Sequence, residues 1–399
     1  MLLLSLFMIL LFGLALSLVC KFLRIPALIG YLAVGIILGP YVLNLIDPKI
    51  LAISSELRKI ALIIILIKAG LSLNITDLKK IGRPAILMAF LPAIIEMFAI
   101  GLLAPIIFGI SYLDAFILGC ILGAVSPAVV VPRMVAMIDE KQGTEQGIPQ
   151  LIVAGSSIDD VVVIVIFTAL MTIATGGTIG VMTYLNIPIS IFSGSLLGVL
   201  IGLFLVWFFN KVHIRDTIKV IIILAISLGL VAAEELLTGI VGFSGLISII
   251  SMGMVILYKY RILAERLTLK FSKLWVFAEI LLFVMLGATV NITLFVSNLG
   301  FGILLILGGL ALRSLGVLLS LIKTHLSTKE RLFCTIAYTP KATVQAAIGG
   351  IPLAMGLISG DLLLSIAVVA ILFTAPVGAF LIDISRDRLV PKQQKPQEL

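Results

Sequence analysis

Apolar residues run along this chain in long stretches that short polar segments separate. A helix needs about 20 mostly apolar residues to cross the hydrocarbon layer of a bilayer, so the pattern predicts an all-α, polytopic membrane protein with about thirteen transmembrane helices. The predicted segments are Leu2–Cys20, Ala27–Ile46, Arg58–Leu73, Pro84–Gly109, Leu113–Ile138, Ile148–Thr175, Ile187–Phe209, Thr217–Leu236, Ile240–Tyr258, Leu274–Val290, Leu299–Ile322, Arg331–Ile358 and Asp361–Ser385.

Two of the predicted helices contain a proline within a polar interruption. Ser126-Pro127 interrupts the fifth segment, and Thr339-Pro340 interrupts the twelfth. Proline removes a backbone donor and frees a carbonyl group, and non-helical backbone at membrane depth is tolerated only where protein or a water-filled cavity surrounds it. We therefore expect two broken, crossing helices whose free ends face a shared site near the bilayer midplane.

A weak internal repeat relates the two halves of the chain. Ala69–Leu78 resembles Leu286–Phe295, and the two stretches share a glycine and an Asn-Ile-Thr triplet, each 217 positions apart. In the predicted topology one stretch ends a helix on the cytosolic side and the other ends a helix outside. The chain is therefore expected to contain inverted repeats, roughly residues 25–175 and 240–385, as many secondary transporters do.

Charged residues form only 12% of the chain, against about 25% in soluble proteins, and a few of them lie deep inside predicted helices. Such a charge costs about 3 kcal/mol or more on insertion scales and usually faces a partner or a cavity. Glu96 and Arg313 are 217 positions apart, like the repeat, so we expect them to meet as a buried ion pair. The ionisable residues inside the helices are Lys68, Glu96, Asp159, Asp160, Arg313 and Lys341.

Asp159 and Asp160 stand about twelve residues into the sixth segment, roughly 18 Å along a helix. Ser156 and Ser157 lie one turn earlier, on the same face as Asp160. Carboxylate and hydroxyl oxygens suit a dehydrated Na⁺ or Li⁺, and a carboxylate can also carry a proton, so these four residues are predicted to bind the transported ions. Lys341, at the second break, is expected to pair with Asp159; a structural ion pair without a transport role is the alternative.

Most of the 28 lysine and arginine residues fall in alternate connections and in the residues after 385. This asymmetry predicts an N-terminus outside and a C-terminus in the cytosol, with residues 1–385 as the membrane domain and 386–399 as a short cytosolic tail. The net charge of +8 therefore does not indicate binding to nucleic acid. The first segment is expected to remain as a helix, because it lacks the basic start and cleavage site of a signal peptide.

The sequence shows no phosphate-binding glycine loop, and its three cysteines have no metal-ligand spacing. An ATP-driven pump needs a nucleotide-binding domain, so transport is expected to be secondary or channel-like. The chain is predicted not to be an enzyme and to hold no resident cofactor, the metal ion at Asp159 and Asp160 being transported Na⁺ or Li⁺.

Three motifs resemble the cation:proton antiporter superfamily, in particular the sodium/hydrogen exchanger subfamily B branch and its bacterial relatives. They are residues 123–132 (GAVSPAVVVP), 156–160 (SSIDD) and 340–349 (PKATVQAAIG). The resemblance covers nearly the whole chain. It implies a homodimer in the cell membrane, in which a core slides against a dimerisation scaffold by an elevator motion. It also implies that Asp160 binds cation and proton in competition, beside Asp159, and that Glu96 and Arg313 form a core ion pair.

Na⁺(Li⁺)/H⁺ antiport is thus the leading hypothesis from the sequence. K⁺/H⁺ antiport is the closest alternative, because oxygen ligands alone do not fix the ion radius. An organic-anion symporter on a similar broken-helix fold is a second alternative, although paired aspartates are poor neighbours for a carboxylate. A membrane sensor or channel without coupled exchange is the third.

Overall fold

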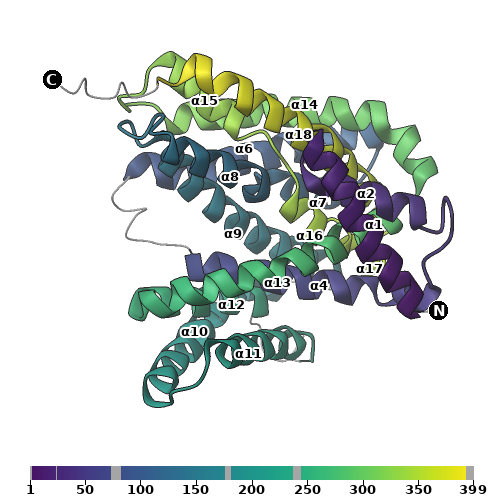
Figure 1. Ribbon diagram of the computed structural model, residues 1–399. Helices are drawn as coiled ribbons and strands as arrows, with labels where there is room; N and C mark the ends of the chain where they lie inside the picture. The colour runs from purple at the N-terminus through teal and green to yellow at the C-terminus, as the bar shows by residue number, and fades with distance from the viewer. Residues whose placement is uncertain (1, 24, 73–81, 176–180, 237–243, 392–399) are drawn as a thin grey trace.

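The computed structural model describes residues 2–23, 25–72, 82–175, 181–236 and 244–391, and every element within them is a helix, as predicted (Figure 1). The helices are α1 (Leu2–Phe22), α2 (Ala27–Leu38), α3 (Pro48–Ala52), α4 (Ser54–Ser72), α6 (Arg83–Phe108), α7 (Tyr112–Gly123), α8 (Pro127–Asp139), α9 (Ile148–Thr175), α10 (Val181–Lys211), α11 (Asp216–Leu236), α12 (Gly245–Lys259), α13 (Arg261–Ala288), α14 (Ile292–Ser320), α15 (Thr328–Ala337), α16 (Thr343–Ile348), α17 (Ile351–Ala354) and α18 (Gly360–Leu389).

Nine helical spans in the described part of the chain are long and apolar enough to cross a membrane. Three shorter apolar stretches, Ala27–Leu38, Gly245–Lys259 and Thr343–Ala354, accompany them. Helix α4 is outside both groups and carries Glu56, Arg58, Lys59 and Lys68 among its apolar residues. Each predicted segment contains at least part of one helix, but the number of membrane crossings stays a prediction.

Several predicted boundaries were wrong. Helix α13 begins at Arg261 instead of Leu274, because the charged residues of its first turns lie on exposed positions and do not interrupt the helix. Helix α2 ends at Leu38 instead of Ile46, because the following Gly39 is extended and Pro40 cannot donate to a continuing helix. The two predicted breaks are present, since residues 124–126 and 339–342 are not helical.

Figure 1 shows α10 and α11 along the lower edge, α12, α13 and α4 above them, and α6, α8, α14, α15 and α18 on the opposite side. Helix α2 packs on α13, and α12 packs on α4. Both contacts bring backbones close: a Cβ on Gly35 would overlap the carbonyl of Val284, and a Cβ on Gly70 would lie 2.6 Å from the carbonyl oxygen of Ile250.

Each of these contacts joins a helix from one predicted repeat to a helix from the other. Packing of helices from one repeat against helices from the other is expected if the halves are inverted copies around a pseudo-two-fold axis. The repeat itself stays a prediction, and most of its first motif, residues 73–78, lies outside the described residues.

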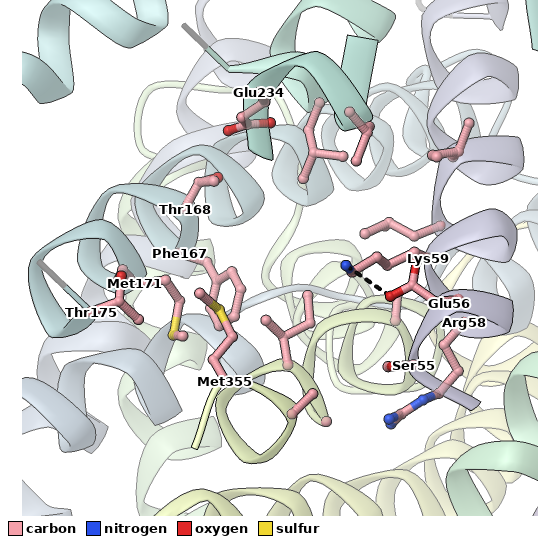
Figure 2. Close-up of a pocket in the computed structure, with 18 of the residues that line it drawn as sticks. Ser55, Glu56, Arg58, Lys59, Phe167, Thr168, Met171, Thr175, Glu234 and Met355 are labelled. Carbon is pink, nitrogen blue, oxygen red and sulfur yellow. Dashed lines mark hydrogen bonds and ion pairs between the residues drawn. The ribbon is translucent and has the colours of Figure 1, made fainter. Parts of the chain in front are cut away.

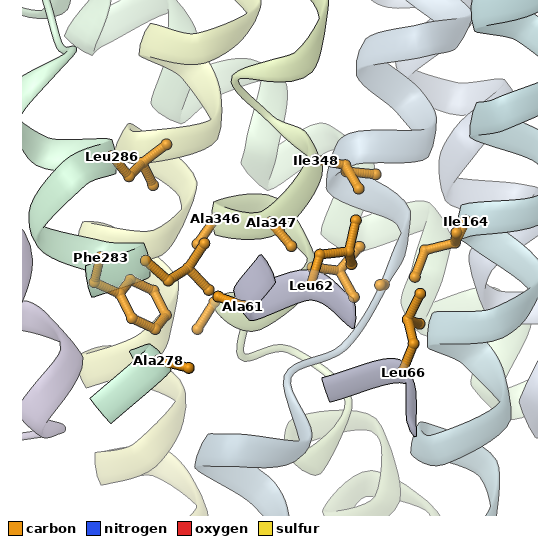
Figure 3. Close-up of a cluster of buried hydrophobic side chains, with 14 of the residues drawn as sticks. Ala61, Leu62, Leu66, Ile164, Ala278, Phe283, Leu286, Ala346, Ala347 and Ile348 are labelled. Atoms are coloured by element: carbon orange, nitrogen blue, oxygen red, sulfur yellow. The ribbon is translucent and has the colours of Figure 1, made fainter. Parts of the chain in front are cut away.

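The buried face of α4 packs against α16, the short helix that follows the second break. Figure 3 shows Ala61 and Leu62 of α4 facing Ala346 of α16, with Phe283 of α13 on one side and Ile164 of α9 on the other. Small and branched apolar side chains fill this contact, so shape complementarity and van der Waals packing hold the two groups of helices together.

Candidate functional site

The two broken helices cross at the centre of the molecule. The backbone N–H of Ser126 donates to the carbonyl of Pro340 at 2.7 Å. The Gln345 amide donates to the carbonyl of Ala124 at 2.9 Å, and the hydroxyl oxygens of Ser126 and Thr343 lie 3.5 Å apart. Polar groups released by one break are thus satisfied by the other, which makes non-helical backbone tolerable at this depth.

Arg313 of α14 caps two half-helices at this crossing. Its Nε donates to the carbonyl of Tyr338 at the end of α15, at 2.9 Å, and its Nη1 donates to the carbonyl of Gly123 at the end of α7. Lys341 Nζ donates to the carbonyl of Leu122, one residue earlier. Cations at helix C-termini meet unpaired carbonyls and the negative end of the helix dipole, so both side chains stabilise the breaks.

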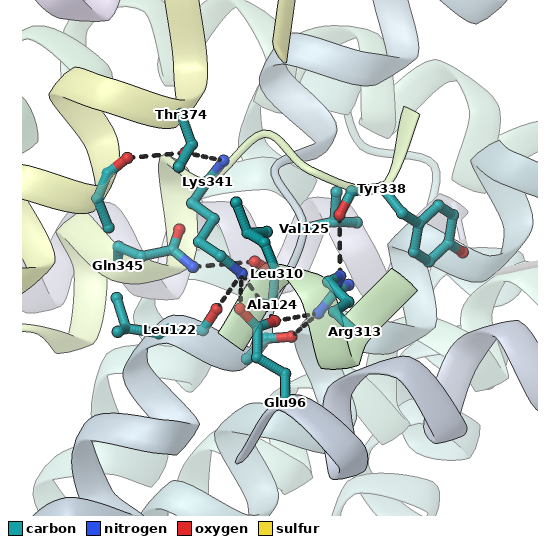
Figure 4. A network of polar contacts seen from close by, with 12 residues as sticks. Glu96, Leu122, Ala124, Val125, Leu310, Arg313, Tyr338, Lys341, Gln345 and Thr374 are labelled. Atoms are coloured by element: carbon teal, nitrogen blue, oxygen red, sulfur yellow. Dashed lines mark hydrogen bonds and ion pairs between the residues drawn. The ribbon is translucent and has the colours of Figure 1, made fainter. Parts of the chain in front are cut away.

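Two carboxylates balance these cations, and Figure 4 shows Glu96 between Lys341 and Arg313. Glu96 lies 2.7 Å from Arg313 Nη1 and 2.7 Å from Lys341 Nζ. Asp159 Oδ2 accepts from Arg313 Nη2 at 2.6 Å and from the backbone N–H of Val125 at 2.9 Å. All four charged side chains are buried. They form one continuous network from α6 through α14 to α9.

The predicted contact between Glu96 and Arg313 is present. The predicted pairing of Lys341 with Asp159 is wrong, because Lys341 binds Glu96 and Asp159 binds Arg313. The reason is the path of the second break, where Thr374 of α18 accepts from the backbone N–H of Lys341 at 2.9 Å. The lysine side chain then points to the end of α7 and to Glu96 (Figure 4).

Asp160 follows Asp159 on α9 and differs from it in its contacts. It is 7% exposed, and its Oδ1 is buried without a hydrogen-bond partner among the described residues. Three carboxylates, Glu96, Asp159 and Asp160, therefore share two cations, Arg313 and Lys341, which leaves a formal charge of −1 when all are ionised. One monovalent cation or one proton at Asp160 would neutralise it.

The predicted serine and threonine residues lie around this centre. Ser156 is buried one turn before Asp160, and its hydroxyl donates to the carbonyl of Val153 at 3.2 Å, so its oxygen lone pairs stay available to a cation. Ser157 lies on the same helix, but its side chain is outside the described residues. Thr339 donates to Ile336 within the end of α15, and Pro127 begins α8.

Sequence reasoning missed Gln345, Thr374 and Tyr338 as parts of this centre. Each is buried, and the Tyr338 ring lies beside Arg313, with 5.4 Å between the guanidinium carbon and the ring centroid. Gln345 is a lone amide within an apolar run, which could have marked it. Thr374 and Tyr338 lie in segments without such a signal, and only tertiary packing shows their contacts.

A cavity of about 500 Å³ opens on the side of the C-terminal end of α9 (Figure 2). The start of α4, with Arg58 and the Glu56–Lys59 pair at 3.1 Å, faces Phe167 of α9 across it. Glu234 of α11 also lines the cavity. Phe167 is seven residues beyond Asp160, about 10 Å along the helix, so the cavity lies about two helical turns from the charged centre.

A helical membrane bundle with two crossing half-helices and an incompletely neutralised buried centre defines a multi-pass membrane transporter. Within that class the chain belongs to the sodium/hydrogen exchanger family. The sequence model described as "Sodium/hydrogen exchanger, transmembrane" matches residues 6–384.

Known relatives agree with this membership. The chain is 32% identical to human sodium/hydrogen exchanger 9B2 over 402 residues, covering 94% of this chain and 72% of that one. It is 31% identical to human sodium/hydrogen exchanger 9B1 over 359 residues, covering 87% and 68%. The structure of the sodium proton antiporter MjNhaP1 from Methanocaldococcus jannaschii superposes with a TM-score of 0.84 at 20% identity, covering 96% of both chains, and so shows the same fold.

Proposed function

We propose that this protein is a secondary active Na⁺(Li⁺)/H⁺ antiporter in which Asp160 binds cation and proton in competition. The observation that carries the proposal is the charge balance of the buried centre, where two cations face three carboxylates. Glu96 and Asp159 form ion pairs with Arg313 and Lys341, whereas Asp160 has no ion pair among the residues that the structure describes, and its buried Oδ1 has no hydrogen-bond partner there. The family of the chain and the names of its relatives support the same activity.

Competition follows from the single negative charge that remains. A bound cation and a bound proton each neutralise it, and both together would leave an excess positive charge in a low-dielectric site. The second oxygen of Asp159, Oδ1, is also buried, and no described residue forms a hydrogen bond with it. With the Ser156 hydroxyl it supplies further oxygen ligands for a small monovalent cation. Arg313 and Lys341 hold the half-helices and the paired carboxylates in place during exchange.

Alternating access is proposed to occur by an elevator motion of the helices around the breaks relative to α4 and α13. The apolar contact between Ala61 and Ala346 supports this, because it contains small side chains that can pass one another (Figure 3). The cavity beside Phe167 would then be one access route to the site. A homodimer in the cell membrane, with the N-terminus outside and the C-terminus in the cytosol, is part of the same proposal.

K⁺/H⁺ antiport is the alternative within cation exchange, since nothing in the ligand set measures ion radius. Transport of an organic anion is disfavoured, because the centre already carries a surplus negative charge. A reconstituted assay separates these activities. Purified protein in liposomes with an internal acidic pH and a trapped pH dye should show dequenching with Na⁺ or Li⁺, a smaller response to K⁺ and none to an organic anion.

Asp160→Asn should abolish this response without loss of folding, because an amide cannot exchange a proton at physiological pH. Asp383→Asn is a matched control, since it removes a half-exposed carboxylate that pairs with Arg133 at the surface; such pairs contribute about 0–1 kcal/mol. The control should keep exchange near the wild-type rate. Robust Na⁺-dependent dequenching by Asp160→Asn would show that the ion site lies elsewhere.

A further inference from the structure

Arg58 of α4 is a buried cation that forms no ion pair with a described residue. It is 6% exposed. Its Nε donates to the carbonyl of Ser54 over a long 3.4 Å, and its buried Nη1 has no hydrogen-bond partner in the described part of the chain. A buried charge of this kind is costly without a partner, and the proposed exchange mechanism gives Arg58 no role.

Arg58 lines the cavity of about 500 Å³ beside the C-terminal end of α9 (Figure 2). The other charged groups on its wall are already bound. Glu56 and Lys59 pair at 3.1 Å, and Glu234 accepts from the backbone N–H of Gly245 at 2.8 Å. Figure 2 shows Glu234 and Arg58 at opposite ends of the cavity. Arg58 is therefore the group on this wall that can receive an anion.

The rest of the wall is mostly apolar. Phe167, Met171 and Met355 lie together across the cavity from the start of α4 (Figure 2), and Leu62 and Ile63 of α4 add to the apolar lining. Binding sites for small organic molecules are typically about 300–1,000 Å³, with apolar walls and a few polar groups that orient the ligand. The size and lining of this cavity fit that description.

We propose that this cavity binds a small organic carboxylate with an apolar body. The planar guanidinium of Arg58 matches a carboxylate in geometry and charge, and the anion would supply the acceptor that Nη1 lacks. The apolar body would lie against Phe167 and Met171, where a ring would also meet the methionine sulfur favourably.

Such a ligand would touch two groups of helices. Arg58 and Leu62 belong to α4, whereas Phe167 belongs to α9 and Ile351 to α17, beyond the second break. The proposed elevator motion moves the helices around the breaks relative to α4, so a ligand wedged between them should slow exchange. This consequence rests on the proposed function, but the binding does not.

The test of binding uses 4-phenylbutyrate as the probe and the purified full-length protein in detergent. Isothermal titration calorimetry, corrected by titration into empty micelles, should show one site. The neutral analogue 4-phenylbutan-1-ol, acetate and chloride should each bind far more weakly, because the alcohol lacks the charge and the two small anions lack the apolar body. Equal affinity for the alcohol or for chloride would overturn the proposal.

Arg58→Gln should weaken 4-phenylbutyrate binding about tenfold or more, because a hydrogen bond to a charged group is among the stronger ones. Arg58→Lys keeps the charge without the planar fork and should fall between that variant and the wild type. Met355 is half-exposed, so Met355→Trp should fold normally and obstruct the cavity while Arg58 stays intact. Wild-type affinity in both Arg58→Gln and Met355→Trp would overturn the site.

The matched control is Lys59→Gln, which removes a neighbouring cation of the same cavity that is already paired with Glu56. It should keep nearly the wild-type affinity. A loss equal to that of Arg58→Gln would mean a diffuse charge effect and would refute a site at Arg58.

The effect on transport is measured as uptake of radioactive Na⁺ into proteoliposomes at equal internal and external pH, because a weak acid would dissipate a pH gradient. External 4-phenylbutyrate should inhibit uptake by the wild type and by Lys59→Gln, and should inhibit Arg58→Gln much less. Binding without any Na⁺ uptake would refute the proposed function and leave the site standing. Na⁺ uptake by a protein that does not bind the probe would refute the site alone.

Discussion

Glu96 provides the sharpest test of the charge network. The structure shows that it is the carboxylate that binds Lys341, whereas Arg313 is bound by both Glu96 and Asp159. Glu96→Gln therefore leaves Lys341 without a carboxylate and leaves Arg313 with Asp159 at 2.6 Å. Removing one partner of a buried ion pair costs about 3–5 kcal/mol, because the other charge stays buried and unpaired.

The same geometry ranks the other variants. Arg313→Gln should cost a similar amount, because Asp159 then loses its cation. Lys341→Gln should cost less than about 3 kcal/mol, since Glu96 keeps Arg313 at 2.7 Å. The double variant Glu96→Gln/Lys341→Gln removes both members of one pair and restores the original charge of −1 at the centre. It should recover much of the stability that Glu96→Gln loses.

The informative comparison is with Glu96→Gln/Arg313→Gln. That double variant has the same formal charge, but Lys341 and Asp159 are both left without their ion-pair partners, so it should recover far less. Thermal unfolding of purified protein in detergent, followed by size-exclusion chromatography after heating, measures all five variants under one condition. Strictly additive losses in Glu96→Gln/Lys341→Gln, or greater recovery in Glu96→Gln/Arg313→Gln, would refute the arrangement of the network.

Three further predictions concern the helix breaks. A Cβ at position 155 would overlap the Tyr338 hydroxyl, so Gly155→Ala should lower the melting temperature of the protein. Adding Tyr338→Phe should restore part of that loss, and no restoration would contradict this contact. Gln345→Leu leaves the carbonyl of Ala124 without its donor and should lower the free energy of unfolding by about 1–3 kcal/mol. The Na⁺ affinity in the liposome assay should also fall, and unchanged stability and affinity would show that this bond is dispensable. Ser126→Ala removes only a 3.5 Å hydroxyl contact and should cost less than about 1 kcal/mol, so a large loss of stability would reveal a second role for this hydroxyl.

The sequence by itself determined the class of this fold and the location of its centre. Uninterrupted apolar stretches of this length favour the helix in hydrocarbon, because a helix satisfies nearly all of its backbone groups within its own segment. The prolines at 127 and 340 marked both breaks. Charges such as Glu96 and Arg313 were conspicuous because a buried charge in a membrane helix is costly, and their shared offset predicted their contact.

The tertiary structure decided which charges pair. Lys341 and Arg313 are both cations at mid-helix depth, and no feature of the sequence shows which carboxylate each one reaches. The path of the backbone through the second break, fixed by Thr374, turns Lys341 toward Glu96 and leaves Asp159 to Arg313. Of the three carboxylates in the buried centre, Asp160 is then the one that forms no ion pair with a described residue. That distinction between adjacent aspartates arises because neighbouring side chains on a helix point about 100° apart and meet different helices.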